Sequence, residues 1–163
     1  MDIELKDLYL KQAELDKTIA ENHSIDYPST QKRRSLALLV ELGELANTTR
    51  CFKFWSNKGP ESKERILDEY ADGLHFILSL GIAIGVKETA YHVEDDDLDL
   101  TDALLLAYDN INEFIKDNSI KNYFTAMYSY LLILYKLGFT YEEAHEAYLK
   151  KLDVNYKRQE TNY

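Results

Sequence analysis

The stretch LALLVELGELANTTRCFKFW, residues 36–55, decides the fold because it is an apolar helix with two acids in its most hydrophobic part. Glu41 and Glu44 are three residues apart, so a helix turns both toward the same side, among leucines. Two carboxylates this close repel each other, and burial adds a large desolvation cost. A single pair of this kind is more often the solvated edge of a helix, so this stretch alone predicts a helix but no site.

A second pair of acids repeats the arrangement. In ILDEYADGLHFILSL, residues 66–80, Glu69 and Asp72 are again three apart, and an apolar run follows. Two antiparallel helices can bring both pairs face to face, and converging carboxylates then need a divalent cation to offset their repulsion. Oxygen ligands favour Mg²⁺, with Mn²⁺ as a possible substitute, over zinc. The sequence therefore predicts a metal site built from Glu41, Glu44, Glu69 and Asp72.

The whole chain, residues 1–163, is predicted to be a single all-α domain. It contains only two prolines and six glycines, and no run shows the strict alternation of a strand. Thr140 and Glu143 predict a capping box before the last helix. The acidic run 94–102 reads as a solvated turn rather than a calcium loop. We expect a bundle of five to six helices, near residues 5–22, 32–53, 64–85, 102 onward, 121–137 and 141–158.

Composition limits the compartment and the partners. The net charge of −10 argues against nucleic acid and against an anionic membrane as partners. Cys51 is the only cysteine, which fits a reducing compartment. No apolar run reaches membrane-spanning length, and the first residues lack a signal-peptide core. We expect a soluble cytoplasmic protein, and the aromatic residues of 121–137 are expected to serve packing or a homodimer surface.

Four segments of the chain carry a common pattern. The second-helix segment ELGELANTTRCFKFWSNK contains the first acid pair and ends with Lys53 and Trp55, and DEYADGLHFILSLG holds the second pair. QAELD lies in the first helix, and KLDVNYKRQETNY ends the chain. Together they resemble the dimeric dUTPases, a branch of the all-α nucleoside triphosphate pyrophosphatases that also include the MazG-like enzymes. The resemblance covers nearly the whole chain, with two departures: Asp16 stands where many members have Asn, and Asn162 replaces the usual glycine before the final tyrosine.

The resemblance implies magnesium-dependent hydrolysis of dUTP to dUMP and pyrophosphate by a homodimer, which controls the dUTP pool. It assigns Glu41 as the general base for a water that attacks the β-phosphorus, so dUDP is also an expected substrate. The residues it implies for phosphate binding are Lys53, Lys151, Asn155, Arg158 and Tyr163. Those it implies for the base and sugar are Gln12, Asp16, Trp55, His75 and Phe76.

Three alternatives stay open at this stage. Asp16 can only accept hydrogen bonds when ionised, which suits uracil N3–H but equally a cytosine amino group, so dCTP or another noncanonical nucleotide is an alternative substrate. A noncatalytic partner-binding bundle is a second alternative, although the four intact acids argue against it. An iron-binding bundle is the third, with Asp72 and His75 in place of a Glu-x-x-His pair.

Overall fold

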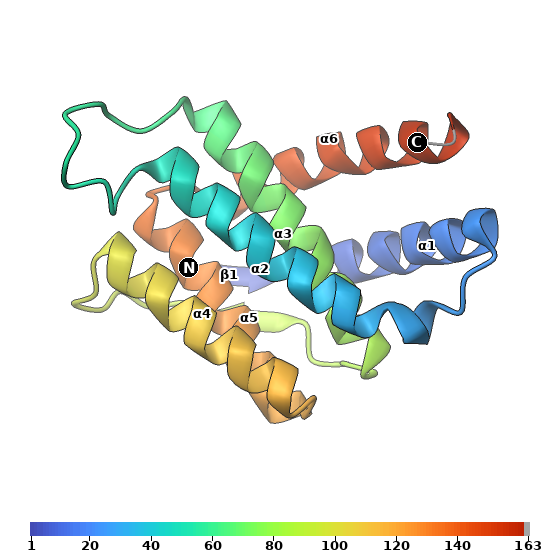
Figure 1. Ribbon diagram of the computed structural model, residues 1–163. Helices are drawn as coiled ribbons and strands as arrows, with labels where there is room; N and C mark the ends of the chain where they lie inside the picture. The colour runs from blue at the N-terminus through green and yellow to red at the C-terminus, as the bar shows by residue number, and fades with distance from the viewer. Residues whose placement is uncertain (162–163) are drawn as a thin grey trace.

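The computed structural model describes residues 1–161, and these form a helical bundle with a very small sheet (Figure 1). The all-α prediction is confirmed. A 3₁₀ turn, η1, covers Tyr27–Thr30, and two short antiparallel strands pair Asp2 with His92 and Glu4 with Ala90. The strands are β1 Asp2–Glu4 and β2 Ala90–His92, and the helices are α1 Lys6–His23, α2 Gln31–Thr49, α3 Lys63–Ala83, α4 Leu100–Lys116, α5 Ile120–Lys136 and α6 Tyr141–Glu160.

Helix α3 is the centre of the bundle. It packs along α2 and also contacts α1 and α6 (Figure 1). Helices α4 and α5 form a second pair, in which α4 packs on α2 and α5 packs on α3. Ser62 caps α3 by accepting a hydrogen bond from the Arg65 amide, which fixes where the helix begins. Most residues of α3 are buried, Glu69 among them, and Asp72 is half-buried, so this pair of acids does not lie on a fully solvated face.

Two glycines of α3 let α5 approach closely. A Cβ added at Gly73 would lie 2.3 Å from the Tyr130 hydroxyl oxygen, and one at Gly81 would lie 2.3 Å from that of Tyr123. Both tyrosines have no exposed surface, and the Tyr130 hydroxyl donates to the Tyr70 carbonyl oxygen at 2.7 Å. These aromatic side chains of α5 therefore belong to the core of one chain and form no surface for a second copy.

Local signals set the helix ends, and one of them differs from the prediction. The capping box at Thr140 is present, and Asp99 caps α4 by accepting from the Asp102 amide, as a solvated acidic turn should. The second helix was expected to reach residue 53, but Arg50 takes a left-handed conformation with φ 58° and ends α2 at Thr49. Residues 50–62 are consequently a loop.

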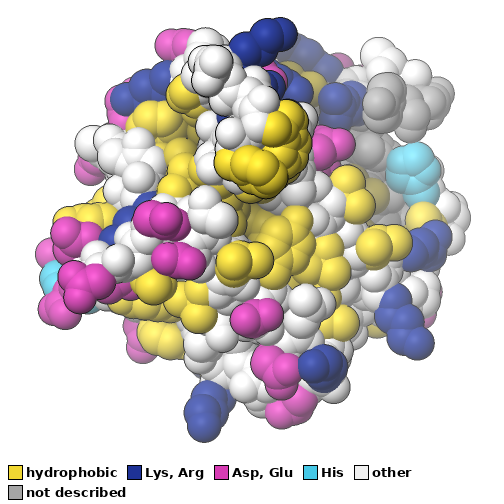
Figure 2. Space-filling model, turned by 60° about the vertical axis from the view of Figure 1, so that its left-hand side comes forward, with side chains coloured by type: hydrophobic (Ala, Val, Ile, Leu, Met, Phe, Trp, Pro, Cys, Tyr) yellow, Lys and Arg dark blue, Asp and Glu magenta, His cyan; other side chains and the backbone are white. Residues whose placement is uncertain are grey.

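This loop carries an exposed aromatic cluster made of Phe52, Phe54 and Trp55. Trp55 lies edge-on to Phe54 at 5.1 Å and to Phe52 at 6.1 Å between ring centroids, and Phe54 is 93% exposed. Figure 2 looks onto the side where the loop lies in Figure 1 and shows apolar side chains gathered there. None of the described helices combines the length and hydropathy needed to cross a membrane.

Candidate active site

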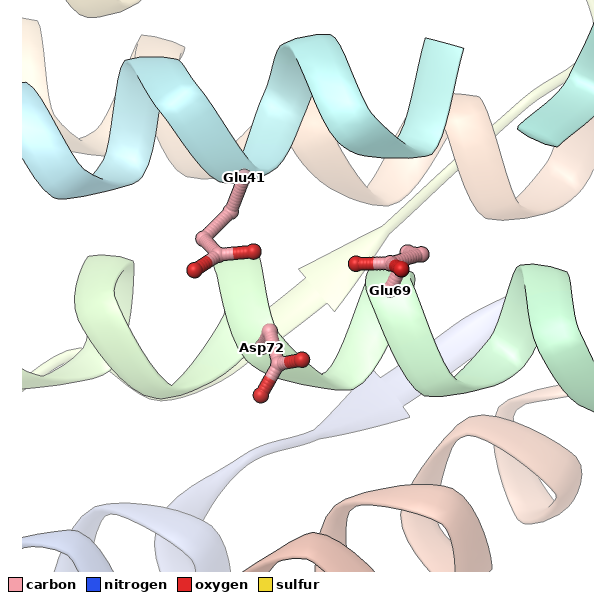
Figure 3. A group of neighbouring side chains, drawn as sticks. All are labelled: Glu41, Glu69 and Asp72. Carbon is pink, nitrogen blue, oxygen red and sulfur yellow. The ribbon is translucent and has the colours of Figure 1, made fainter. Parts of the chain in front are cut away.

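An acid cluster lies where α2 meets α3. Glu41 reaches from α2 toward Glu69 and Asp72 on α3 (Figure 3), and one carboxylate oxygen from each lies within 4.8 Å of the other two. Glu44 lines the same cavity beside them. Three of the four predicted acids thus form a tight group, with the fourth at its edge. This spacing suits oxygens that share a divalent cation.

The electrostatics of the acid cluster centre on Glu41. Burial and the charges of Asp72, Glu44 and Glu69 raise the pKa of Glu41 to about 7. Its Oε2 is buried and has no hydrogen-bond partner among residues 1–161. A buried carboxylate oxygen without a partner is costly unless a cation or a donor arrives. The residues present therefore fit a divalent metal, which the site would use to offset this repulsion.

Two basic side chains balance part of the negative charge. Lys151 of α6 contacts Asp72 at 2.8 Å and Asp68 at 2.9 Å. Arg65 makes a close ion pair with Glu69 and contacts Asp68 at 3.1 Å. Burial raises the pKa of Asp72, and Lys151 opposes this increase. Burial also raises the pKa of Glu69, and Arg65 opposes that increase. Arg65 and Asp68 were not among the predicted site residues. The sequence did offer a signal for Arg65, because it precedes Glu69 by four residues, which places both on one face of a helix.

A cavity of about 530 Å³ joins the acid cluster to the helices at either side. Lys151, Asn155 and Arg158 present one face of α6 to it, with an Arg158 Nη1 hydrogen donated to Asn155 Oδ1 at 3.5 Å. At the other end, α1 and α3 contribute the predicted base-binding side chains. In all, eleven predicted site residues line this cavity: Gln12, Asp16, Glu41, Glu44, Glu69, Asp72, His75, Phe76, Lys151, Asn155 and Arg158.

Two predicted residues are not brought to the cavity, and a third cannot be placed. Lys53 and Trp55 do not line it, because α2 ends at Thr49 and both residues lie in the following loop. Trp55 is 65% exposed, so it stacks on no base slot within its own chain. Tyr163 lies outside the described residues.

The base end of the cavity is a buried polar network. Gln12 Nε2 donates to Asp16 Oδ1 at 2.8 Å, while Gln12 Oε1 contacts His75 Nδ1 at 2.6 Å and accepts from the Tyr148 hydroxyl at 2.9 Å. The His75 ring stacks on Tyr148 with centroids 4.0 Å apart, and burial lowers the pKa of His75 to about 3. His75 is therefore neutral. Its position outside the acid group argues against the iron-binding alternative.

Opposite charges thus face each other across one cavity, with a polar slot beside them. Acids that fit a divalent cation, a basic helix face and neighbouring polar groups are the parts that a nucleotide hydrolase requires. A model of the dUTPase family, the all-α type, matches residues 4–163. The chain belongs to this family, and it is a dUTP diphosphatase that hydrolyses dUTP to dUMP and pyrophosphate. A search of curated proteins found no match.

Proposed function

We propose that this cavity is the active site, that it works with Mg²⁺, and that it accepts dUDP as well as dUTP. The observation that carries the proposal is the acid cluster with its unpartnered Glu41 oxygen, facing the basic side of α6. Glu41, Glu44, Glu69 and Asp72 would hold the ion, and Mn²⁺ would substitute. A bound ion of this kind supplies charge neutralisation at the phosphate oxygens.

Glu41 is proposed as the general base. Without a metal ion the pKa of Glu41 is about 7, and a bound cation would lower it, so the carboxylate would be ionised and able to accept a proton near neutral pH. Its neighbours cause this value, because burial and three other acids all disfavour the charged carboxylate. Glu41 would orient the attacking water and accept the proton of that water on its unpartnered Oε2.

Phosphate binding is proposed for the α6 face of Lys151, Asn155 and Arg158. These residues are four and three positions apart, so they lie on one side of the helix, and all three line the cavity. Lysine and arginine can both donate charge-assisted hydrogen bonds to phosphate oxygens. Lys53 and Tyr163 remain proposals that rest on the resemblance alone.

The uracil slot is proposed between α1 and α3. Gln12 has one amide hydrogen beyond its bond to Asp16, and Phe76 lines the cavity beside them. A uracil edge offers N3–H between two carbonyl oxygens, which this pair of polar groups can bind. The cytosine reading stays the alternative, because Asp16 accepts from an amino group equally well.

A homodimer is part of the proposal. The aromatic cluster of Phe52, Phe54 and Trp55 is exposed, and α2 carries two further exposed apolar side chains, Leu36 and Val40. Large exposed apolar patches mark protein interfaces, and a second copy of the chain is the simplest partner. A cytoplasmic location is also proposed, on composition alone.

The deciding experiment is a nucleotide panel with product analysis. dUTP, dUDP, dCTP and dTTP are incubated with Mg²⁺, with Mn²⁺ or with a chelator, and the products are separated by chromatography. We expect dUMP and pyrophosphate from dUTP, turnover of dUDP, and no turnover in the chelator. Full activity without metal would reject the acid cluster as a metal site, and a preference for dCTP would replace uracil with cytosine.

A further inference from the structure

A buried arginine lies behind the base end of the cavity. Arg34 of α2 is 6% exposed and does not line the cavity. Its Nη1 donates to the Ser79 hydroxyl oxygen at 2.9 Å and to the Ser79 carbonyl oxygen at 3.1 Å. Its guanidinium carbon lies 4.3 Å from the centre of the Tyr27 ring. A permanent charge is thus held inside the protein, one side chain away from Asp16.

The chemistry of Arg34 fixes the direction of the next hydrogen bonds. Arginine only donates, so the Ser79 hydroxyl oxygen must accept, and its own hydrogen is directed to Asp16 Oδ2 at 2.7 Å. The Tyr27 hydroxyl donates to Asp16 Oδ1 at 2.8 Å. Asp16 therefore receives donors on both oxygens, which stabilises the ionised carboxylate.

The same direction continues through Gln12 to His75. An ionised Asp16 only accepts, so the Gln12 atom facing it must be the amide nitrogen, 2.8 Å away. Gln12 Oε1 then faces His75 Nδ1 and the Tyr148 hydroxyl, and both must donate to it. Neutral His75 consequently carries its proton on Nδ1.

The opposite direction is equally possible for these atoms if Asp16 is protonated. Asp16 would then donate to the Gln12 oxygen, the Gln12 nitrogen would face His75 Nδ1, and His75 would carry its proton on Nε2. Burial raises the pKa of Asp16 and favours this reversed state, whereas the hydrogen bonds from Ser79, Gln12 and Tyr27 and, with a smaller effect, the charge of Arg34 oppose it. Arg34 therefore acts mainly through the Ser79 hydroxyl that it holds in place. Three tyrosines also face this network, and burial raises the pKa of each, so they add no charge near neutral pH: Tyr27, Tyr148 and Tyr156. Lys151 faces it as well, and its positive charge helps to lower the pKa of His75, which keeps the imidazole neutral in either direction of the hydrogen bonds.

We propose that Arg34 is a positioning residue for base selection, which acts through Ser79 to set the direction of the hydrogen bonds from Asp16 through Gln12 to His75. In this direction the slot offers an Asp16 acceptor beside a Gln12 N–H donor, which complements the N3–H and an adjacent carbonyl of uracil. The reversed direction exchanges these roles. The effect on selectivity rests on the base slot proposed above, whereas the His75 tautomer does not.

The test compares Arg34→Met with Arg34→Lys, which keeps the charge, and with Arg33→Met, which removes an exposed charge next to it. The first readout is the ¹⁵N spectrum of histidine-labelled protein without nucleotide, in which a His75→Gln variant identifies the His75 signals. The second is the ratio of kcat/KM for dUTP to that for dCTP. Thermal unfolding is recorded for every variant.

We expect His75 to be the Nδ1–H tautomer in the unmodified protein, in Arg34→Lys and in Arg33→Met, and the Nε2–H tautomer in Arg34→Met. The selectivity ratio should fall about tenfold or more in Arg34→Met, as for loss of a buried hydrogen bond to the base. An unchanged tautomer in Arg34→Met overturns the inference, because a purely structural arginine has no reason to move that proton.

Two further outcomes keep the two proposals separate. A change of tautomer with an unchanged selectivity ratio overturns the assignment of Gln12 and Asp16 to the base slot, and with it the role of Arg34 in selection. If Arg34→Met does not fold, Ser79→Ala interrupts the same link and leaves the arginine in place. Mixed His75 tautomers and a reduced ratio in Ser79→Ala then support the inference, and unchanged values of both overturn it.

Discussion

Replacing Glu41 with Gln should stabilise the metal-free protein at alkaline pH while removing most of its turnover. The pKa of Glu41 rises from 4.5 in the unfolded chain to about 7 in the fold. The folded state thus holds this proton more tightly, so stability is lost as pH rises from about 4.5 to about 7 and stays lower above that. Below pH 4.5 the carboxyl is protonated in both states, and Gln should have little effect there.

The magnitude follows from the same pKa difference of about 2.5, which corresponds to about 3 kcal/mol at most. Water in the cavity screens part of this interaction and leaves about 1–2 kcal/mol. In a chain of 163 residues the melting temperature of Glu41→Gln at pH 8 should then exceed that of the unmodified protein by about 3–6 °C.

The assay is thermal unfolding followed by circular dichroism in chelator at pH 5, 7 and 8, and again with saturating Mg²⁺. The order should invert with Mg²⁺, because an ion held by four carboxylates stabilises the unmodified protein more than the variant. Glu146→Gln is the matched control, since Glu146 is exposed on α6. Parallel pH profiles for the unmodified protein and Glu41→Gln in chelator would refute the reasoning, and retained turnover would reject Glu41 as the base.

Three further outcomes test other parts of the structure. Lys151→Met should lower kcat/KM for dUTP about tenfold or more. The same change should raise the Mg²⁺ affinity measured by calorimetric titration without nucleotide, because Lys151 competes with the ion for Asp72. Weaker Mg²⁺ binding would contradict this. Gly73→Ala should lower the free energy of unfolding, measured with denaturant, by about 1–3 kcal/mol, because the added carbon meets the Tyr130 hydroxyl. Adding Tyr130→Phe should recover part of this loss. An equal loss in the double variant would argue against this contact. Trp55→Asp should shift sedimentation from dimer to monomer, whereas Leu10→Asp, at an exposed leucine of α1, should not; a dimer in both would place the interface elsewhere.

The parts of the site that were predictable from the sequence are those encoded within single helices. Glu41 with Glu44, and Glu69 with Asp72, share a face because three residues make almost one turn. The spacing of Lys151, Asn155 and Arg158 works in the same way. The meeting of these faces is long-range, and carboxylates that converge repel each other. Two such pairs on two helices nevertheless pointed to a shared cation, so the convergence of Glu41 with Glu69 and Asp72 was also predictable.

The supporting contacts were not predictable because their partners are far apart in the chain. Tyr148 reaches Gln12 across 136 residues, and no spacing rule links α6 to α1. The end of α2 was missed for a different reason, since Arg50 is neither Gly nor Asn, the residues that usually adopt a left-handed conformation at a helix end. That error put Lys53 at the end of the helix, whereas Lys53 and Trp55 both lie in the loop that follows Thr49.

One helix pair holds both the acid cluster and the base end of the cavity. Arg34 precedes Glu41 on α2 by two helical turns, and Ser79 follows Asp72 on α3 by the same distance, so the two pairs meet at two levels of one interface. A shift of α3 along α2 would therefore move Asp72 from Glu41 and Ser79 from Arg34 together. The close contact of Gly73 with Tyr130 opposes such a shift, since a buried tyrosine hydrogen-bonded to the α3 backbone has no room to follow it. The packing of α5 on α3 thus holds the proposed metal ligands and the proposed base slot in register with each other.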